Sequence, residues 1–69
     1  MEYGALNQIE GTVTEIKKGN VMSQVTVDIG GNNQVSSVMT LESLNNLNVK
    51  EGDQVKTVVK AVNVLLVKE

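Results

Sequence analysis

Apolar and polar residues alternate over two stretches near the start of the chain, and this period of two is typical of strands. In the first stretch, residues 7–17, the alternation slips once, which predicts a β-bulge or bend near Glu15. Gly11 lies within it and marks either a close backbone approach or the corner of a barrel. The second stretch, residues 21–29, places its aliphatic residues on one face, and a turn at residues 19–20 separates the two.

A short helix is predicted at residues 41–47, because leucines recur there at helical spacing after Thr40, a favoured N-cap residue. Three further β-type segments flank it along the chain. The first of them follows a turn at residues 30–33, where Gly and Asn tolerate positive φ. The expected strands are residues 34–39 before the helix and residues 54–59 and 62–67 after it.

The resulting order is three strands, a helix and two final strands. It predicts an all-β fold, a five-stranded OB-like Greek-key barrel with one short helix between strands 3 and 4. The final segment, residues 62–67, is apolar almost without interruption, which is unusual for a strand with one face in water. We therefore expect it to be covered on both faces, at an interface between subunits. No internal boundary is indicated, so residues 1–69 are interpreted as one domain.

The chain is too short to be comfortably stable alone. Its 69 residues include no Cys and no His, which leaves no disulfide and none of the usual transition-metal ligands. Apolar residues make up 41% of the chain, thirteen of them valine, and only Tyr3 is aromatic. Such a core fills little volume per residue. We therefore expect copies of the chain to associate and so bury the apolar surface that one copy leaves exposed.

Composition also narrows the function. Without His or Cys, and with no Ser or Thr in a nucleophile motif, no catalytic residue is identified and we expect a binding protein, not an enzyme. A net charge of −2 and a single aromatic residue argue against a nucleic-acid partner. No stretch is long enough to span a membrane and no basic leader is evident, so we expect a cytoplasmic protein without a membrane partner.

The junction between the third strand and the helix is the strongest candidate for a binding site. The first amides of a helix and the positive end of its dipole favour an oxyanion, and the Thr40 and Ser43 hydroxyls lie at this end. On the residues alone, a Thr40 that only caps the helix is the simpler interpretation. Both interpretations remain open at this point.

Three short segments, residues 5–11, 37–43 and 59–61, occur in an order and spacing that resemble a known family. Together they resemble the molbindins, small proteins made of a single Mop domain of the TOBE class, and the similar tungbindins. The resemblance covers almost the whole chain, from Gly4 to Val67. It implies a cytoplasmic protein that binds molybdate or tungstate, with no organic cofactor and no free metal cation. It also implies a homohexamer, a trimer of dimers, with binding sites at subunit interfaces.

The resemblance further implies which residues bind the anion. Backbone groups of Ala5, Leu6 and Asn7 would approach it from one side of an interface and Thr40 and Ser43 from the other, with Lys60 and the Ala61 amide completing the site. The motif in relatives commonly reads Ser-Ala-Arg-Asn-Gln, whereas here Gly4 replaces Ser and Leu6 replaces Arg. One hydroxyl and one cation are therefore missing, which bears on affinity and on the choice between molybdate and tungstate.

A second kind of site in the family lies on the threefold axis, near the turn between the first two strands. The corresponding residues here are Lys18, Gly19, Asn20 and Val21. On the residues alone, a solvated basic hairpin tip is the simpler interpretation. Lys60 lies in a largely apolar segment, where a lysine must reach solvent or meet an anion, and the family pattern favours the anion.

The leading hypothesis is therefore intracellular binding, storage and homeostasis of molybdate or tungstate by a homo-oligomer. The alternative is an oxyanion-sensing interaction module that assembles on a transporter or regulator. An OB-type nucleic-acid binder is a third possibility, disfavoured by the negative charge and the single aromatic residue.

Overall fold

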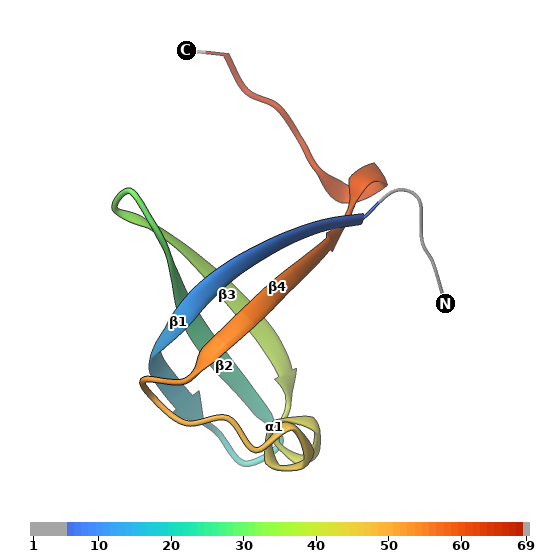
Figure 1. Ribbon diagram of the computed structural model, residues 1–69. Coiled ribbons are helices and arrows are strands. Elements are labelled where there is room, and N and C mark those ends of the chain that lie inside the picture. The colour runs from blue at the N-terminus through green and yellow to red at the C-terminus, as the bar shows by residue number, and fades with distance from the viewer. Residues whose placement is uncertain (1–5, 69) are drawn as a thin grey trace.

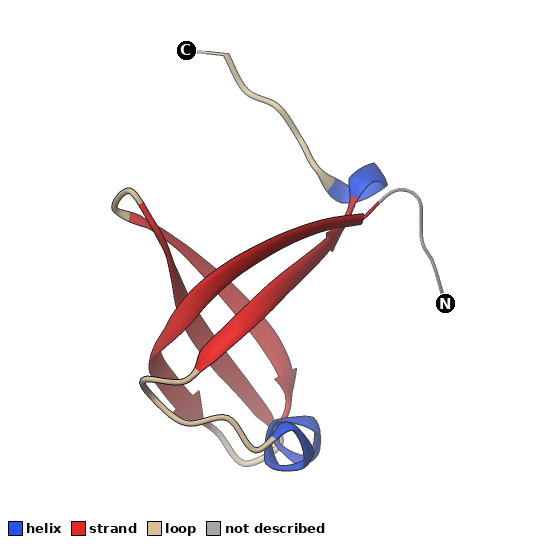
Figure 2. Ribbon diagram, in the orientation of Figure 1, coloured by secondary structure: helices blue, strands red, loops and turns tan. Residues whose placement is uncertain are grey.

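The computed structural model describes residues 6–68, in which four strands form a curled sheet with a short helix at one end (Figure 1). The elements are β1 (Leu6–Lys18), β2 (Met22–Gly30), β3 (Asn33–Thr40), α1 (Leu41–Leu47), β4 (Gln54–Lys60) and the 3-10 turn η1 (Ala61–Asn63). The strands neighbour one another in the order β3-β2-β1-β4, and every pair is antiparallel. Figure 2 shows that helix is confined to the two ends of this half-barrel, while strands form its wall.

β1 joins the two halves of the sheet because it pairs with two other strands. Its first half pairs with β4, starting from Leu6 opposite Lys60, and its second half pairs with β2. The register with β2 shifts between Val13 and Glu15, which confirms the bulge predicted near Glu15. A bulge bends a strand and increases its twist, so β1 can follow both halves of a curled sheet.

Gly11 permits a close approach between β1 and β2. A Cβ atom at this position would lie 2.6 Å from Val27 Cγ1 and 2.7 Å from the Asp28 carbonyl oxygen. Both distances are shorter than ordinary van der Waals contact, so a side chain here would force the strands apart. Of the two interpretations of Gly11, the close backbone approach is the one observed.

The core lies between the concave face of the sheet and α1. Val13, Val25 and Val27 from the sheet and Leu44 from the helix are each at most 5% exposed. Partly buried aliphatic residues surround them: Ile16, Ile29, Met39, Leu41, Val49 and Val55. α1 therefore closes one end of the half-barrel by placing Leu44 among the strand valines.

The helix has the bounds that the sequence predicts. Thr40 is the N-cap, with φ −66° and ψ 153°, and its side chain accepts a hydrogen bond from the Ser43 N–H. At the other end Asn48 adopts the left-handed conformation with φ 57°, and its N–H donates to the Leu44 carbonyl at 3.1 Å. This arrangement satisfies a carbonyl of the last turn and ends the helix.

The fifth strand predicted at residues 62–67 is wrong for a single subunit. The turn η1 begins at Ala61 instead, and the Val64 N–H donates to the Ala61 carbonyl at 3.2 Å. Within the described part of the chain, sheet pairing ends at Lys60, and residues 64–68 lead away from the barrel (Figure 1). A strand needs a sheet edge beside it, and η1 turns this segment away from its own sheet. The all-β class and the helix between the third and fourth strands are confirmed, and the fold is an OB-like barrel with four of its strands in place.

Candidate oxyanion-binding site

Thr40 and Ser43 form a pair of hydroxyl groups at the start of α1. Thr40 pairs with Met22 as the last residue of β3 and caps α1, so two elements fix its position. Its Oγ1 accepts from the Ser43 N–H at 3.0 Å, and its hydroxyl donates to Ser43 Oγ at 2.9 Å. Both side chains are exposed. Since Ser43 Oγ already accepts from Thr40, the Ser43 hydroxyl keeps its own proton for a ligand.

Two of the backbone amides at the start of α1 already donate hydrogen bonds within the subunit. The Leu41 N–H donates to the Val21 carbonyl at 2.7 Å, which joins the helix to the turn between β1 and β2. The Ser43 N–H is the group that Thr40 caps, so the capping interpretation of Thr40 is confirmed. Glu42 is exposed in the first turn. Because the Leu41 and Ser43 amides and the Thr40 hydroxyl already donate within the subunit, the side-chain donor that this helix start keeps for an anion is the Ser43 hydroxyl.

The pairing of β1 with β4 brings other predicted residues together. Leu6 lies opposite Lys60 at the end of the ladder, Asn7 follows in β1, and Ala61 follows β4 as the first residue of η1. Residues of β4 alternate between half-buried and exposed, and Lys60 is on the exposed side. Its ammonium group thus reaches solvent directly, although its sequence neighbours are apolar. Ala5 lies outside the described residues.

These two groups of residues lie at opposite ends of the subunit. In Figure 1 the start of β1 and the end of β4 lie together at one end of the half-barrel, and α1 lies at the other. One subunit therefore does not bring Thr40 and Lys60 to the same anion. A binding site that contains both residues requires at least two copies of the chain.

The turn between β1 and β2 lies beside the start of α1. Asn20 and Val21 line an open cavity of about 600 Å³ together with Thr40 and Glu42. Part of the second predicted site is therefore next to the Thr40 half of the first, within one subunit. The charged side chain in this lining is the carboxylate of Glu42, which does not favour an anion in the cavity of a single subunit.

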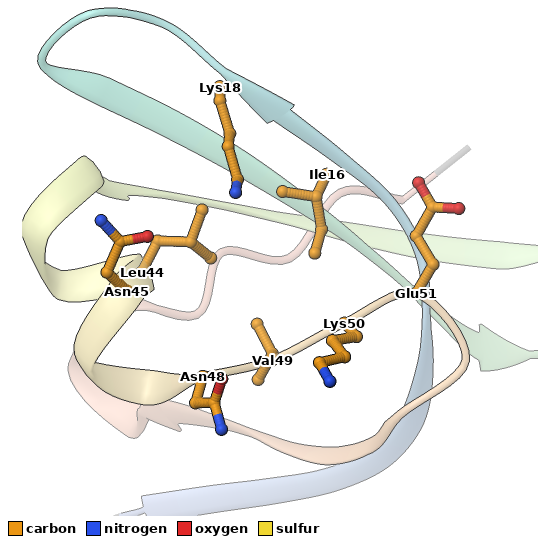
Figure 3. Close-up of a pocket in the computed structure, with 8 residues that line it drawn as sticks. All are labelled: Ile16, Lys18, Leu44, Asn45, Asn48, Val49, Lys50 and Glu51. Atoms are coloured by element: carbon orange, nitrogen blue, oxygen red, sulfur yellow. The ribbon is translucent and has the colours of Figure 1, made fainter.

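Lys18 and Gly19 of the same turn have other contacts. The Gly19 N–H closes the turn by donating to the Met22 carbonyl at 2.8 Å. Lys18 extends into a separate cavity of about 300 Å³ near the C-terminal end of α1, with Asn48 and Lys50 on the other side (Figure 3). The sequence pattern did not place Lys50 there, because the loop that carries it has no periodicity. The carboxylate of Glu51 lines the same cavity, so the two lysines do not give it a purely positive lining.

The described residues do not form a cluster suited to a metal cation. Among residues 6–68, no group of three His, Cys, Asp or Glu side chains could hold a metal ion. In the same part of the chain, no helix is long and apolar enough to cross a bilayer. The two ends of the subunit carry hydroxyl, amide and ammonium donors, and the Glu42 carboxylate lies at the helix end.

Comparison with known proteins agrees with this geometry. The TOBE domain model matches residues 4–66. The chain belongs to the TOBE-domain family. Molybdenum-pterin-binding protein 2 of Clostridium pasteurianum is 39% identical to it over 66 residues, which cover 96% of this chain and 97% of the relative.

Solved structures of similar proteins share the fold. A molybdate-binding protein from Sporomusa ovata matches with a TM-score of 0.87 and 34% identity, over 99% of this chain and 100% of that one. The cytoplasmic molybdate-binding protein ModG matches with a TM-score of 0.79 and 36% identity, over 86% of this chain and 42% of that one. The resemblance to the molbindins, seen first in three short segments, is thereby confirmed.

Proposed function

We propose that this TOBE-domain protein binds molybdate or tungstate in the cytoplasm, at interfaces between identical subunits, and so stores and buffers the anion. The observation that carries the proposal is the separation of the donors, with Thr40 and Ser43 at one end of the subunit and Lys60 and Ala61 at the other. These donors suit one anion, yet a single subunit holds them apart. A site that forms when subunits assemble accounts for this separation. The names of the relatives support the choice of anion.

The donor groups suit a tetrahedral dianion. Molybdate and tungstate each present four acceptor oxygens, which need N–H and O–H groups from several directions. The Ser43 hydroxyl, the Ala61 amide and the Lys60 ammonium group supply one charged and two neutral donors. Hydrogen bonds to charged groups contribute about 1.5–3 kcal/mol each, so several of them can outweigh the desolvation of the anion.

The proposed assembly is a homohexamer, a trimer of dimers, without catalytic residues or an organic cofactor and without nucleic-acid or membrane partners. Three copies of the turn at residues 18–21 would then form a second anion site on each threefold axis. Because an anion at an interface contacts more than one subunit, it stabilises the assembled state over separate subunits. Ligand occupancy and assembly therefore favour each other.

Calorimetric titration with molybdate, tungstate, sulfate and phosphate tests the ligand, and native mass spectrometry counts subunits and bound anions. The decisive variant is Lys60→Ala, and Lys56→Ala is its matched control, since both lysines are exposed on the same side of β4. Loss of a charged donor should weaken molybdate binding about tenfold or more in Lys60→Ala. The Lys56→Ala variant should stay within about twofold of the unaltered protein, because an exposed charge away from the site is screened by salt.

Three outcomes would contradict the proposal. If neither molybdate nor tungstate gave heat on titration or stabilised the protein thermally, neither anion would be the ligand. Equal weakening in the two lysine variants would show an effect of net charge and no particular role for Lys60. Tight binding of a pterin without binding of molybdate would transfer the function to the other ligand in the name of the Clostridium relative.

A further inference from the structure

The cavity near the C-terminal end of α1 has an apolar floor. Its volume is about 300 Å³, at the lower end of the range that small-molecule sites occupy. Leu44 is 3% exposed, and Ile16 and Val49 are partly buried residues that pack against the core. A ligand in this cavity therefore places part of its surface against three aliphatic side chains, which favours an apolar group.

Polar side chains of both charges surround this floor. The rim is made of exposed residues that end in two ammonium groups, two carboxamides and one carboxylate: Lys18, Lys50, Asn45, Asn48 and Glu51. In Figure 3 the Lys18 ammonium group points between Leu44 and Ile16. Glu51 lies on the side of the cavity opposite Asn45 in the same view. The rim therefore carries partners for an anionic group and for a cationic group.

The backbone, and not the rim side chains, holds the loop that follows α1. The Lys50 N–H donates to the Asp53 carboxylate at 2.9 Å, and the Gly52 N–H donates to the Val13 carbonyl at 2.7 Å. Within residues 6–68, the side-chain hydrogen bonds do not use any of the five polar side chains of the rim. The loop thus places the Lys50 and Glu51 side chains at the cavity and leaves their charged ends for a ligand.

We propose that this cavity binds a free α-amino acid with an aliphatic side chain. The carboxylate of the ligand accepts hydrogen bonds from the Lys18 and Lys50 ammonium groups, and its own ammonium group donates to the Glu51 carboxylate. The aliphatic side chain of the ligand covers the apolar floor. This site goes beyond the proposed binding of an oxyanion and uses none of the donors at Thr40, Ser43 or Lys60.

The mixed charge of the rim favours an amino acid over a simple anion or a simple amine. Two lysines alone suit any small anion, but Glu51 repels a ligand whose only charge is negative. An amine without a carboxylate meets two ammonium groups of its own charge. The carboxamides of Asn45 and Asn48 both donate and accept, so they suit either end of the ligand. A compound with both charges and an apolar group is the one that pairs with every part of this lining.

The test titrates the full chain, without any oxyanion, with three compounds that share one branched carbon skeleton. Free leucine carries both charges, α-ketoisocaproate lacks the ammonium group, and isoamylamine lacks the carboxylate. Two-dimensional amide and methyl nuclear magnetic resonance spectra give the dissociation constant of each compound and locate its site. Leucine should shift the signals of Asn45, Asn48 and Val49, and it should bind about tenfold or more tightly than either analogue.

Substitutions in the loop assign the two charges of the ligand. Glu51→Gln should weaken leucine about fivefold or more and leave α-ketoisocaproate no weaker, because only leucine has an ammonium group to lose a partner. Lys50→Gln should weaken both compounds, since both have a carboxylate. Lys56→Gln is the control, an exposed lysine of β4 outside this cavity, and should leave the affinities within about twofold. Lys18 stays unaltered, because it also belongs to the second anion site of the proposed function.

Three results would overturn the proposal. Leucine that shifts no signal at the cavity is the first. The second is α-ketoisocaproate that binds as tightly as leucine, which would make this a site for anions in general. The third is equal weakening of leucine by Lys50→Gln and Lys56→Gln, because net charge alone would then govern binding. Since no oxyanion is present, a failure of molybdate binding leaves these results unchanged.

Discussion

The two ends of the half-barrel differ in how far one chain completes them. At the helix end, Val13 and Leu44 are 1% and 3% exposed, because α1 fills the space between the strands. At the other end Ile9 is 37% and Val58 is 55% exposed, and no helix or strand among residues 6–68 covers them. The helix end therefore depends on this chain alone, whereas the open end depends on what joins it.

The polar residues are divided in the same way. At the helix end Thr40 and Ser43 bond to each other at 2.9 and 3.0 Å, so their positions are set before any ligand arrives. At the open end Lys60 is exposed at the last rung of the β1–β4 ladder. A prearranged pair of hydroxyl groups and a solvent-exposed ammonium group on separate ends are suited to a site that assembly completes.

The largest expected effect is on the free energy of unfolding, which should respond differently to substitutions at the two ends. Leu44→Ala leaves a cavity in the core and should lower the free energy of unfolding by about 3 kcal/mol. Leu65→Ala removes an exposed side chain and should lower it by less than about 0.5 kcal/mol in the isolated subunit. Urea denaturation at several protein concentrations measures both.

Concentration dependence sharpens this first comparison. The loss in Leu44→Ala should be the same at every protein concentration, since the cavity is within one subunit. The loss in Leu65→Ala should grow as concentration rises, because a side chain that is exposed in one subunit contributes only once copies associate. If both variants lost the same free energy of unfolding at every protein concentration, the two ends would not differ as described.

The next effect lies in β1, where the helix end passes into the open end. Gly11→Ala places a methyl group within 2.7 Å of the Asp28 carbonyl and should cost about 2 kcal/mol of stability by overpacking. Glu10→Ala, at the neighbouring exposed position, is the matched control and should stay within about 0.5 kcal/mol. Thermal unfolding of both variants checks the difference. A Gly11→Ala variant as stable as the unaltered chain would show that the close approach is not needed for the curl of the sheet.

The sequence predicts local features better than paired ones, and the helix shows why. Thr40 and the leucine spacing lie within a few residues of each other, so the bounds Leu41–Leu47 follow from contacts along one segment. The bulge near Glu15 is visible in the same way, as a slip in alternation. The strand at residues 62–67 was wrong because its formation depends on a sheet edge that its own chain does not present to it.

The candidate site shows the same difference between features set by nearby residues and features set by distant ones. The contact between Thr40 and Ser43 spans three residues and was predictable from capping preferences. Lys60 is exposed because of its position in the alternation of β4. In the sequence, its apolar neighbours gave no indication of this exposure. Lys50 lines the same cavity as Lys18 from a loop without periodicity, so no pattern in the chain could indicate it.

A smaller effect tests whether the hydroxyl pair has a role beyond capping. Thr40→Val removes the acceptor for the Ser43 N–H and should cost about 1 kcal/mol of stability, while Thr40→Ser should restore most of it. Ser43→Ala keeps the cap and removes only the exposed hydroxyl, so its stability should change by less than about 0.5 kcal/mol. If both Thr40→Val and Ser43→Ala weaken molybdate binding, the pair contacts the anion. Unchanged affinity in the two variants would leave Thr40 as a cap alone.

The smallest expected effect concerns the charge at the open end. The resemblance to the molbindins implies an Arg at the position of Leu6, whose backbone lies opposite Lys60. Leu6→Arg should tighten molybdate binding about threefold to tenfold, since a guanidinium group adds charge-assisted hydrogen bonds to those of Lys60. Leu6→Met controls for side-chain length without charge, and calorimetry at two salt concentrations checks that the gain is electrostatic. If Leu6→Arg brings no gain, Lys60 and the backbone amides are sufficient, and the charge that the open end contributes to the anion comes from one lysine per subunit.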